Sequence, residues 1–167
     1  MASRAEEYFK QIKNSASPAE FLKGLLTSKP PRFEDEWLEF KGNPHNDRDG
    51  INAWSKSLSA FANTEGGVLI WGIDARKKDN TDSASGLRLI TNTSEFKSRL
   101  LELLIGATDP PVSGVQIEEI VEPPGSKQGF VVCLIPESEY KPVRAELEMK
   151  QYYIDLTMPR KSSIRRS

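Results

Sequence analysis

The sequence lacks several features that would assign it to a common class of protein. It has one cysteine, Cys133, so a disulfide framework or a thiolate zinc site within one chain is excluded. Its one histidine, His45, cannot build a two-histidine metal site. No GxxxxGK[ST] phosphate loop is present, and no apolar run reaches the 18 residues of a membrane span. We therefore expect a cytoplasmic protein with no membrane partner.

An excess of either charge is also missing. The 167 residues include 23 basic and 24 acidic side chains, which give a net charge of -1. This balance excludes a histone-like polycation, so a nucleic-acid partner would have to be held by a local group of basic residues. The length of the chain suits one globular domain, and its 37% of hydrophobic residues is enough to form a single core.

The spacing of apolar residues predicts an α+β fold, because the expected helices and strands do not alternate regularly. Asp49 and Ser94 are the expected N-caps of the third and fourth helices, and Gly66 is the expected end of the third. The polar stretch 76–85 is expected to be a mobile loop. The expected elements are helices over 3–13, 18–27, 50–65 and 95–108, and strands over 37–41, 68–73, 115–121, 129–135 and 151–154.

Three carboxylates stand at places from which they could meet. Glu34 precedes the strand at 37–41, Glu39 lies inside it, and Asp74 follows the next apolar strand. On that first strand, Leu38 and Phe40 are expected to face one side, with Trp37, Glu39 and Lys41 on the other. The odd spacing of Glu34 and Glu39 puts them on opposite faces of a straight strand, so their convergence requires a bend near residues 35–36.

Converging carboxylates would form a site of hard oxygen ligands. Such a site suits Mg²⁺ or Mn²⁺, which could activate water beside a phosphodiester, and Lys41 could contact the scissile phosphate. A plainer interpretation makes residues 34–36 a solvated acidic turn, pairs Glu39 with Lys41 or Arg48, and makes Asp74 a turn residue. Spacing alone leaves both interpretations open.

Two stretches of the sequence resemble the Alba-like (AlbA_2) domain of the Schlafen family. They are residues 34–41, EDEWLEFK, and residues 58–74, LSAFANTEGGVLIWGID, and weaker similarity extends over about 33–155. The resemblance implies a single Schlafen-core lobe, in which a mixed sheet packs with helices and binds nucleic acid. We therefore expect an N-terminal helical preface at 1–32, a Schlafen-like Alba domain at 33–156 and a basic C-terminal tail at 157–167.

The resemblance also implies a possible activity. Vertebrate members are metal-dependent endoribonucleases that cut transfer and ribosomal RNA with three carboxylates. Carried over by motif, these would be Glu34, Glu39 and Asp74, holding Mg²⁺ or Mn²⁺ beside Lys41. The leading hypothesis is therefore an endoribonuclease that acts on structured RNA such as transfer RNA.

Two alternatives stand beside that hypothesis. The first is a non-catalytic DNA- or RNA-binding regulatory module, as many prokaryotic relatives are described. The second is a PD-(D/E)xK nuclease in which Glu39 and Lys41 form the carboxylate–lysine pair. In that fold the partner aspartate precedes the pair, whereas Asp74 follows it.

Basic residues at two places could hold a phosphate backbone. They are Arg76, Lys77 and Lys78, directly after Asp74, and Arg160, Lys161, Arg165 and Arg166 in the tail. A solvated turn and a disordered end are the plainer interpretations of these groups. Because vertebrate members place two related lobes in one chain, we expect this single lobe to form a homodimer.

Three further polar residues have structural interpretations. Cys133 lies in an apolar run and is expected to be a buried, inert thiol. His45 is expected to be a solvated loop residue. Asn63 is expected to satisfy backbone groups at the end of a helix, with a direct ligand role as the alternative.

Overall fold

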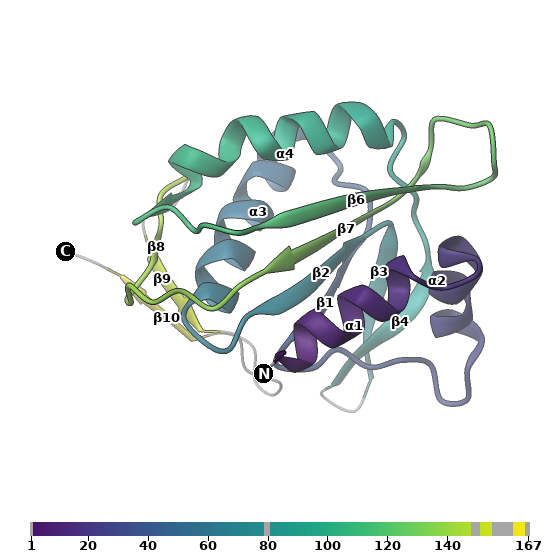
Figure 1. Ribbon diagram of the computed structural model, residues 1–167, viewed down its shortest axis with the longest axis horizontal. Helices are drawn as coiled ribbons and strands as arrows, with labels where there is room; N and C mark the ends of the chain where they lie inside the picture. The colour runs from purple at the N-terminus through teal and green to yellow at the C-terminus, as the bar shows by residue number, and fades with distance from the viewer. Residues whose placement is uncertain (1, 79–80, 148–150, 155–161, 166–167) are drawn as a thin grey trace.

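A computed structural model gives the arrangement of the chain in space (Figure 1). It describes residues 2–78, 81–147, 151–154 and 162–165, with the backbone alone described at 76–78, 81–82, 151–154 and 162–165. The helices are α1 (Arg4–Lys13), α2 (Pro18–Thr27), α3 (Asp47–Ala62) and α4 (Thr93–Ala107). The strands are β1 (Leu38–Lys41), β2 (Gly67–Trp71), β3 (Ile73–Lys78), β4 (Thr81–Leu87), β5 (Thr108–Asp109), β6 (Gln116–Val121), β7 (Gly129–Ile135), β8 (Arg144–Ala145), β9 (Gln151–Ile154) and β10 (Ser162–Arg165).

The main sheet has four strands in the order β1-β2-β7-β6 and lies between two helical layers (Figure 1). β1 and β2 run parallel, with Leu38 opposite Val68, while the other neighbours are antiparallel. Val68 and Ile70 pack on the side of α1 and α2, and Leu69 and Trp71 pack on the side of α3 and α4. Both faces of β2 are therefore buried, which explains its unbroken apolar sequence. The α+β fold class is confirmed.

Two smaller sheets complete the fold. β3 and β4 form an antiparallel hairpin, and a second four-stranded sheet has the order β10-β9-β8-β5. The expectation of a mobile loop at 76–85 is wrong, because this stretch belongs to the hairpin. β4 is tied to the segment before β1: Ser83 pairs with Phe33, and Ala84 N–H donates to Arg32 O at 2.9 Å. These backbone bonds hold a polar sequence in an extended form.

The apolar run 68–73 is divided by Gly72, so the single strand expected there is wrong. Gly72 has φ +116°, a conformation that L side chains rarely adopt, and an added Cβ would lie 2.9 Å from Phe130 Cδ1. The chain turns at this residue and begins β3 at Ile73. Asp74 therefore belongs to a second sheet and not to the end of β2.

The caps of α3 and α4 also differ from the expected ones. The N-caps are Asn46 and Asn92, whose side chains accept hydrogen bonds from the backbone N–H three residues later. Asp49 thus lies in the first turn of α3. α3 ends at Ala62, before Gly66, whose N–H donates to Phe61 O at 3.0 Å. None of the helices in the described parts of the chain is long and apolar enough to span a membrane.

Candidate functional site

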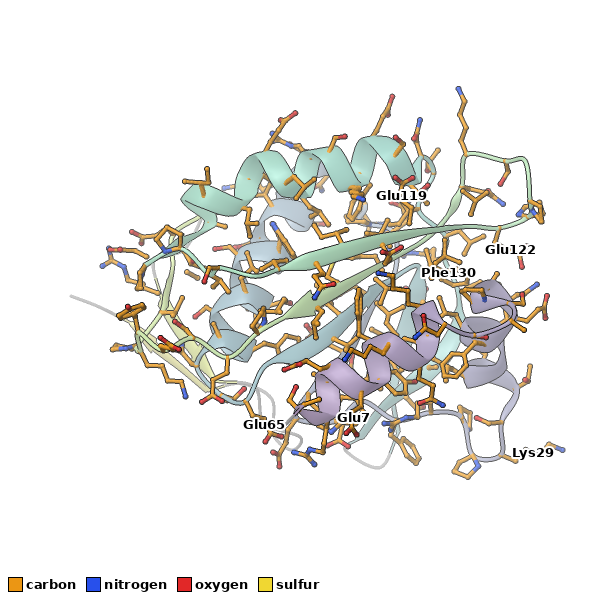
Figure 2. The ribbon with its side chains drawn as sticks, in the orientation of Figure 1. Glu7, Lys29, Glu65, Glu119, Glu122 and Phe130 are labelled. Atoms are coloured by element: carbon orange, nitrogen blue, oxygen red, sulfur yellow. The ribbon has the colours of Figure 1, made fainter. Side chains whose placement is uncertain are left out.

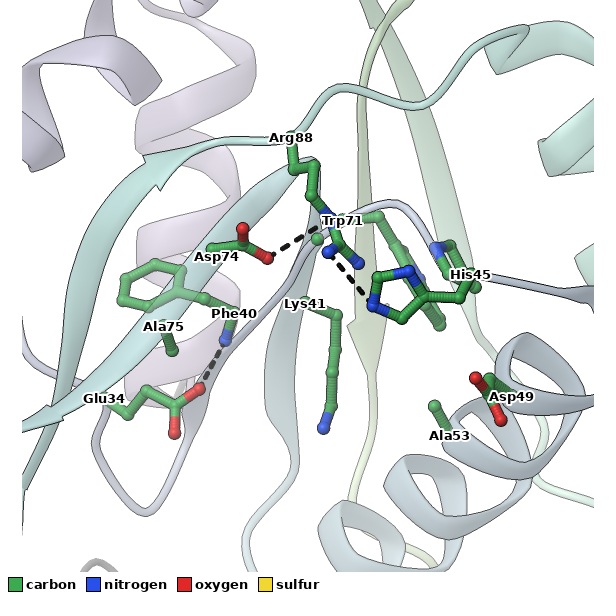
Figure 3. Close-up of a pocket in the computed structure, with 12 residues that line it drawn as sticks. Glu34, Phe40, Lys41, His45, Asp49, Ala53, Trp71, Asp74, Ala75 and Arg88 are labelled. Atoms are coloured by element: carbon green, nitrogen blue, oxygen red, sulfur yellow. Dashed lines mark hydrogen bonds and ion pairs between the residues drawn. The ribbon is translucent and has the colours of Figure 1, made fainter.

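A polar pocket of about 330 Å³ lies where β1, β3 and the start of α3 meet (Figure 3). Trp71 and Phe40 contribute aromatic surface to its wall. Three carboxylates and two permanently basic side chains share the lining, so formal negative charge exceeds positive charge. The ionisable residues of the lining are Glu34, Lys41, His45, Asp49, Asp74 and Arg88.

A bend in the chain brings Glu34 to this pocket. Asp35 and Leu38 exchange two backbone hydrogen bonds, of 3.0 and 3.2 Å, which reverse the chain just before β1. Glu34 Oε2 then accepts a hydrogen bond of 2.7 Å from the N–H of Phe40. A bend is therefore present near residues 35–36, and Glu34 is only 5% exposed and does not belong to a solvated turn.

Glu39 lies apart from the pocket, in the interior. Its side chain is 3% exposed, and its Oε1 accepts a hydrogen bond of 2.7 Å from the Ser57 hydroxyl on α3. Leu38 and Phe40 pack on the other side of β1, as the alternation predicts. Trp37 was expected beside Glu39 but packs with Leu38 and Phe40, because it precedes the first residue of β1.

Arg88 lies between Asp74 and His45 in the lining of the pocket (Figure 3). Its Nε lies 3.5 Å from Asp74 Oδ1, at ion-pair distance, and one of its terminal nitrogens donates to Asn43 O. The other terminal nitrogen lies 3.2 Å from His45 Nε2. Because a guanidinium has only donors, Nε2 is the acceptor in this contact. His45 is exposed, as expected, but it contacts Arg88 in addition to solvent.

Gly42 leaves the room for this ion pair. A Cβ at that position would collide with Asp74 Oδ1 and with Arg88 Nε. Sequence reasoning did not select Gly42 or Arg88. Arg88 directly follows β4, and no spacing rule connects it to Asp74, because the hairpin itself was not expected.

The three predicted ligands do not form a ready metal site. Among residues 2–78 and 81–147 and the two short C-terminal strands, no three His, Cys, Asp or Glu side chains are grouped so that they could hold a metal ion. Glu34 and Glu39 each accept a short hydrogen bond, and Asp74 faces Arg88. Their oxygens are of the type that Mg²⁺ prefers, but the arrangement does not fit a preformed ion site. Metal binding by these residues stays a prediction.

The predicted basic residues fall into three groups: one is described with its side chain, some by their backbone alone, and some lie outside the described residues. Lys41 ends β1, and its ammonium group extends into the pocket (Figure 3). Arg76, Lys77 and Lys78 lie on β3, opposite Ser83, Asp82 and Thr81 of β4, and Arg165 lies on β10 opposite Gln151; only their backbone is described. Arg160, Lys161 and Arg166 lie outside the described residues.

Asn63 and Cys133 both have structural roles, but the backbone groups that Asn63 satisfies belong to Val143 and not to the end of its own helix. Asn63 Nδ2 donates to Val143 O at 2.9 Å, and its Oδ1 accepts from Val143 N–H at 2.7 Å. These two bonds fasten the end of α3 to the segment before β8. Cys133 is fully buried, and this burial raises the pKa of its thiol above the ordinary value. The expectation of a buried thiol is confirmed.

Comparison with known proteins finds one family and several solved structures that match this chain. The profile of the family described as Schlafen, AlbA_2 matches residues 34–162. The N-terminal domain of a RecG-related protein from Nitrosomonas europaea matches with 19% identity and a TM-score of 0.49, over 92% of this chain and 90% of that one. The DIP2311 protein from Corynebacterium diphtheriae matches with 13% identity and a TM-score of 0.43, over 89% of this chain and 26% of that one. No curated protein matches the sequence.

Proposed function

Because the chain belongs to the Schlafen AlbA_2 family, we propose that it is a nucleic-acid-binding domain that uses the β3–β4 hairpin and the pocket at the base of this hairpin. The observation that carries the proposal is the continuity of the two. Asp74 and Ala75 line the pocket, and β3 continues directly with Arg76, Lys77 and Lys78. A phosphate backbone that follows the hairpin would therefore reach the pocket.

The hairpin and the pocket differ in charge and therefore contribute differently to binding in this proposal. The hairpin strand carries three consecutive cations, which attract phosphates from any sequence. The pocket has more carboxylates than cations in its lining, so phosphate is repelled there unless Lys41 or Arg88 contacts it. The hairpin thus supplies most of the affinity in this proposal. RNA is the preferred ligand, which rests on the family resemblance.

Fluorescence anisotropy with labelled transfer RNA and a DNA duplex, in EDTA and over a salt series, tests the proposal. The triple variant Arg76→Ala, Lys77→Ala, Lys78→Ala should lower affinity about 10- to 100-fold, and the magnitude of the log–log salt slope should fall by about two to three. A matched control removes three exposed lysines elsewhere: Lys10, Lys29, which projects from the body in Figure 2, and Lys127. Equal losses in the two triple variants, or no binding by the wild type at about 50 mM salt, would contradict the proposal.

A second candidate function is metal-dependent cleavage of structured RNA. The observation in its favour is that the carboxylates of Glu34 and Asp74 and the ammonium group of Lys41 line one pocket. The test compares cleavage of transfer RNA in Mg²⁺, Mn²⁺ and EDTA by the wild type, Asp74→Asn and Glu34→Gln. Glu7→Gln, an exposed carboxylate on α1 labelled in Figure 2, is the control. Cleavage that persists in EDTA or in Asp74→Asn contradicts this function.

The homodimer is a separate proposal. A single lobe offers one basic hairpin, and a second copy would provide a second hairpin for the same nucleic acid. Sedimentation at micromolar concentration, with and without transfer RNA, measures the assembly directly. A monomer under both conditions would remove the dimer while leaving the binding proposal intact.

A further inference from the structure

We propose that Arg88 is the resident cation of the pocket and that its guanidinium excludes a divalent ion from Asp74. The inference concerns the pocket of the proposed binding surface and depends on that proposal only for the functional meaning of the pocket. It assigns to an arginine of this chain the positive charge that the three-carboxylate hypothesis assigns to a metal ion. Four observations support it.

The first observation is the position of the guanidinium. Arg88 Nε lies 3.5 Å from Asp74 Oδ1, within ion-pair distance of that carboxylate. A divalent ion at Asp74 would have to approach within about 2.0–2.6 Å of a carboxylate oxygen. At that distance it would meet the positive charge of Arg88, so the two cations compete for one carboxylate.

The second observation is that contacts other than Asp74 also hold Arg88. Its backbone N–H donates to Gly72 O at 2.9 Å, and its carbonyl accepts from Asn43 N–H at 2.8 Å. Its side chain donates to Asn43 O and contacts His45 Nε2 at 3.2 Å. Moving the guanidinium away from Asp74 would also break its contacts with Asn43 O and His45 Nε2. The position of Arg88 in the pocket is therefore held by Gly72, Asn43 and His45, and not by Asp74 alone.

The third observation is the glycine beside the pair. At Gly42 a Cβ would collide with Asp74 Oδ1 and Arg88 Nε together. Gly42 does not have a positive φ that would by itself require glycine. A side chain at this position would therefore have to displace Asp74, Arg88 or both from their present arrangement.

The fourth observation concerns the remaining charges. Glu34 Oε2 accepts the N–H of Phe40 at 2.7 Å, and Glu39 is buried against Ser57 outside the pocket lining. Lys41 adds a second basic side chain to the same lining. A divalent ion at Asp74 would therefore face two fixed cations with little help from the other two predicted ligands.

The test measures Mn²⁺ binding by the electron paramagnetic resonance signal of the free ion, with no nucleic acid present. We expect weak binding by the wild type and at least about tenfold tighter binding by Arg88→Gln, because a competing unit charge is removed from the carboxylate. The control is Arg99→Gln, which breaks a similar surface pair with Asp47, 3.0 Å apart and outside this pocket. The double variant Arg88→Gln, Asp74→Asn should return to the weak binding of the wild type.

Two further variants keep the test decisive. Arg88→Lys retains the charge and should resemble the wild type, while Gly42→Ala should raise Mn²⁺ affinity by crowding Asp74 and Arg88 apart. Circular dichroism establishes which variants are folded, and Gly42→Ala replaces Arg88→Gln if the latter is not. Tight, stoichiometric Mn²⁺ binding by the wild type, or a gain that survives Asp74→Asn, overturns the inference. Because no nucleic acid is present, failure of the binding proposal does not affect this result.

Discussion

Glu39 and Asp74 belong to one sequence pattern but lie in two different regions of the molecule. Glu39 is 3% exposed in the interior between β1 and α3, where Ser57 donates to it. Asp74 lies at the pocket, its side chain 41% exposed and opposed by Arg88. The comparison teaches that two carboxylates of one motif can have different surroundings: one accepts a hydrogen bond from a hydroxyl in the interior, and the other faces an arginine at the pocket.

Solvent explains why the two carboxylates behave differently. A carboxylate removed from water must keep its hydrogen bonds, since an unpaired buried charge is costly. Glu39 is therefore bound to its place in the interior. A carboxylate at the rim is partly hydrated, so its ion pair contributes little to stability and can be exchanged for another partner. Substitutions in the interior should change folding stability, and substitutions at the rim should change binding.

The largest expected effect tests the interior region. Glu39→Ala should lower the free energy of unfolding by about 1–3 kcal/mol, because it leaves the Ser57 hydroxyl without this acceptor in the core. Urea unfolding followed by circular dichroism measures the change. Ser57→Ala is the matched partner, and the double variant should lose less than the sum of the two single losses. A loss below about 0.5 kcal/mol would mean that Glu39 contributes no more to stability than a carboxylate at the pocket, which would contradict the comparison.

Elements with a strong apolar period could be predicted from the sequence. Helices expected over 3–13 and 18–27 correspond to α1 and α2, and the strand expected over 129–135 coincides with β7. The β3–β4 hairpin could not be predicted in this way, because its residues are mostly polar. Backbone pairing with the segment at 32–33 holds the hairpin in place. Pairing between segments so far apart in the sequence cannot be predicted from composition.

The site was predictable only where local chain geometry decides it. The spacing of Glu34 and Glu39 shows only that their convergence would need a bend, and the bend itself is made by the backbone hydrogen bonds between Asp35 and Leu38. Alternation along the strand explains why Glu39 and Phe40 face opposite sides. Arg88 lies 14 positions after Asp74 and meets it only because the hairpin folds back. Because residues 76–85 were expected to form a loop and not a hairpin, the pairing of Arg88 with Asp74 could not be predicted either.

An intermediate effect comes from a second buried group of the interior. Burial raises the pKa of the Cys133 thiol above the value of 9.0 that applies to an unperturbed thiol. Above pH 9 the unfolded chain loses this proton while the folded chain keeps it, so stability falls as pH rises. Relative to Cys133→Ala, the wild type should lose about 1.4 kcal/mol of unfolding free energy between pH 7 and pH 10. Parallel urea titrations at the two pH values measure this difference, and equal changes in both proteins would contradict it.

The smallest effect on stability is expected at the pocket. Asp74→Asn removes a partly exposed ion pair with Arg88, at 3.5 Å, which should change the free energy of unfolding by less than about 0.5 kcal/mol. Urea unfolding provides the measurement, with Glu39→Ala as the contrasting variant. In the same protein, loss of the Asp74 charge frees Arg88 to attract phosphate, so RNA affinity in EDTA should rise at low salt. A stability loss as large as that of Glu39→Ala would show that Asp74 is also fixed by the fold, and the two regions would then differ in exposure but not in role.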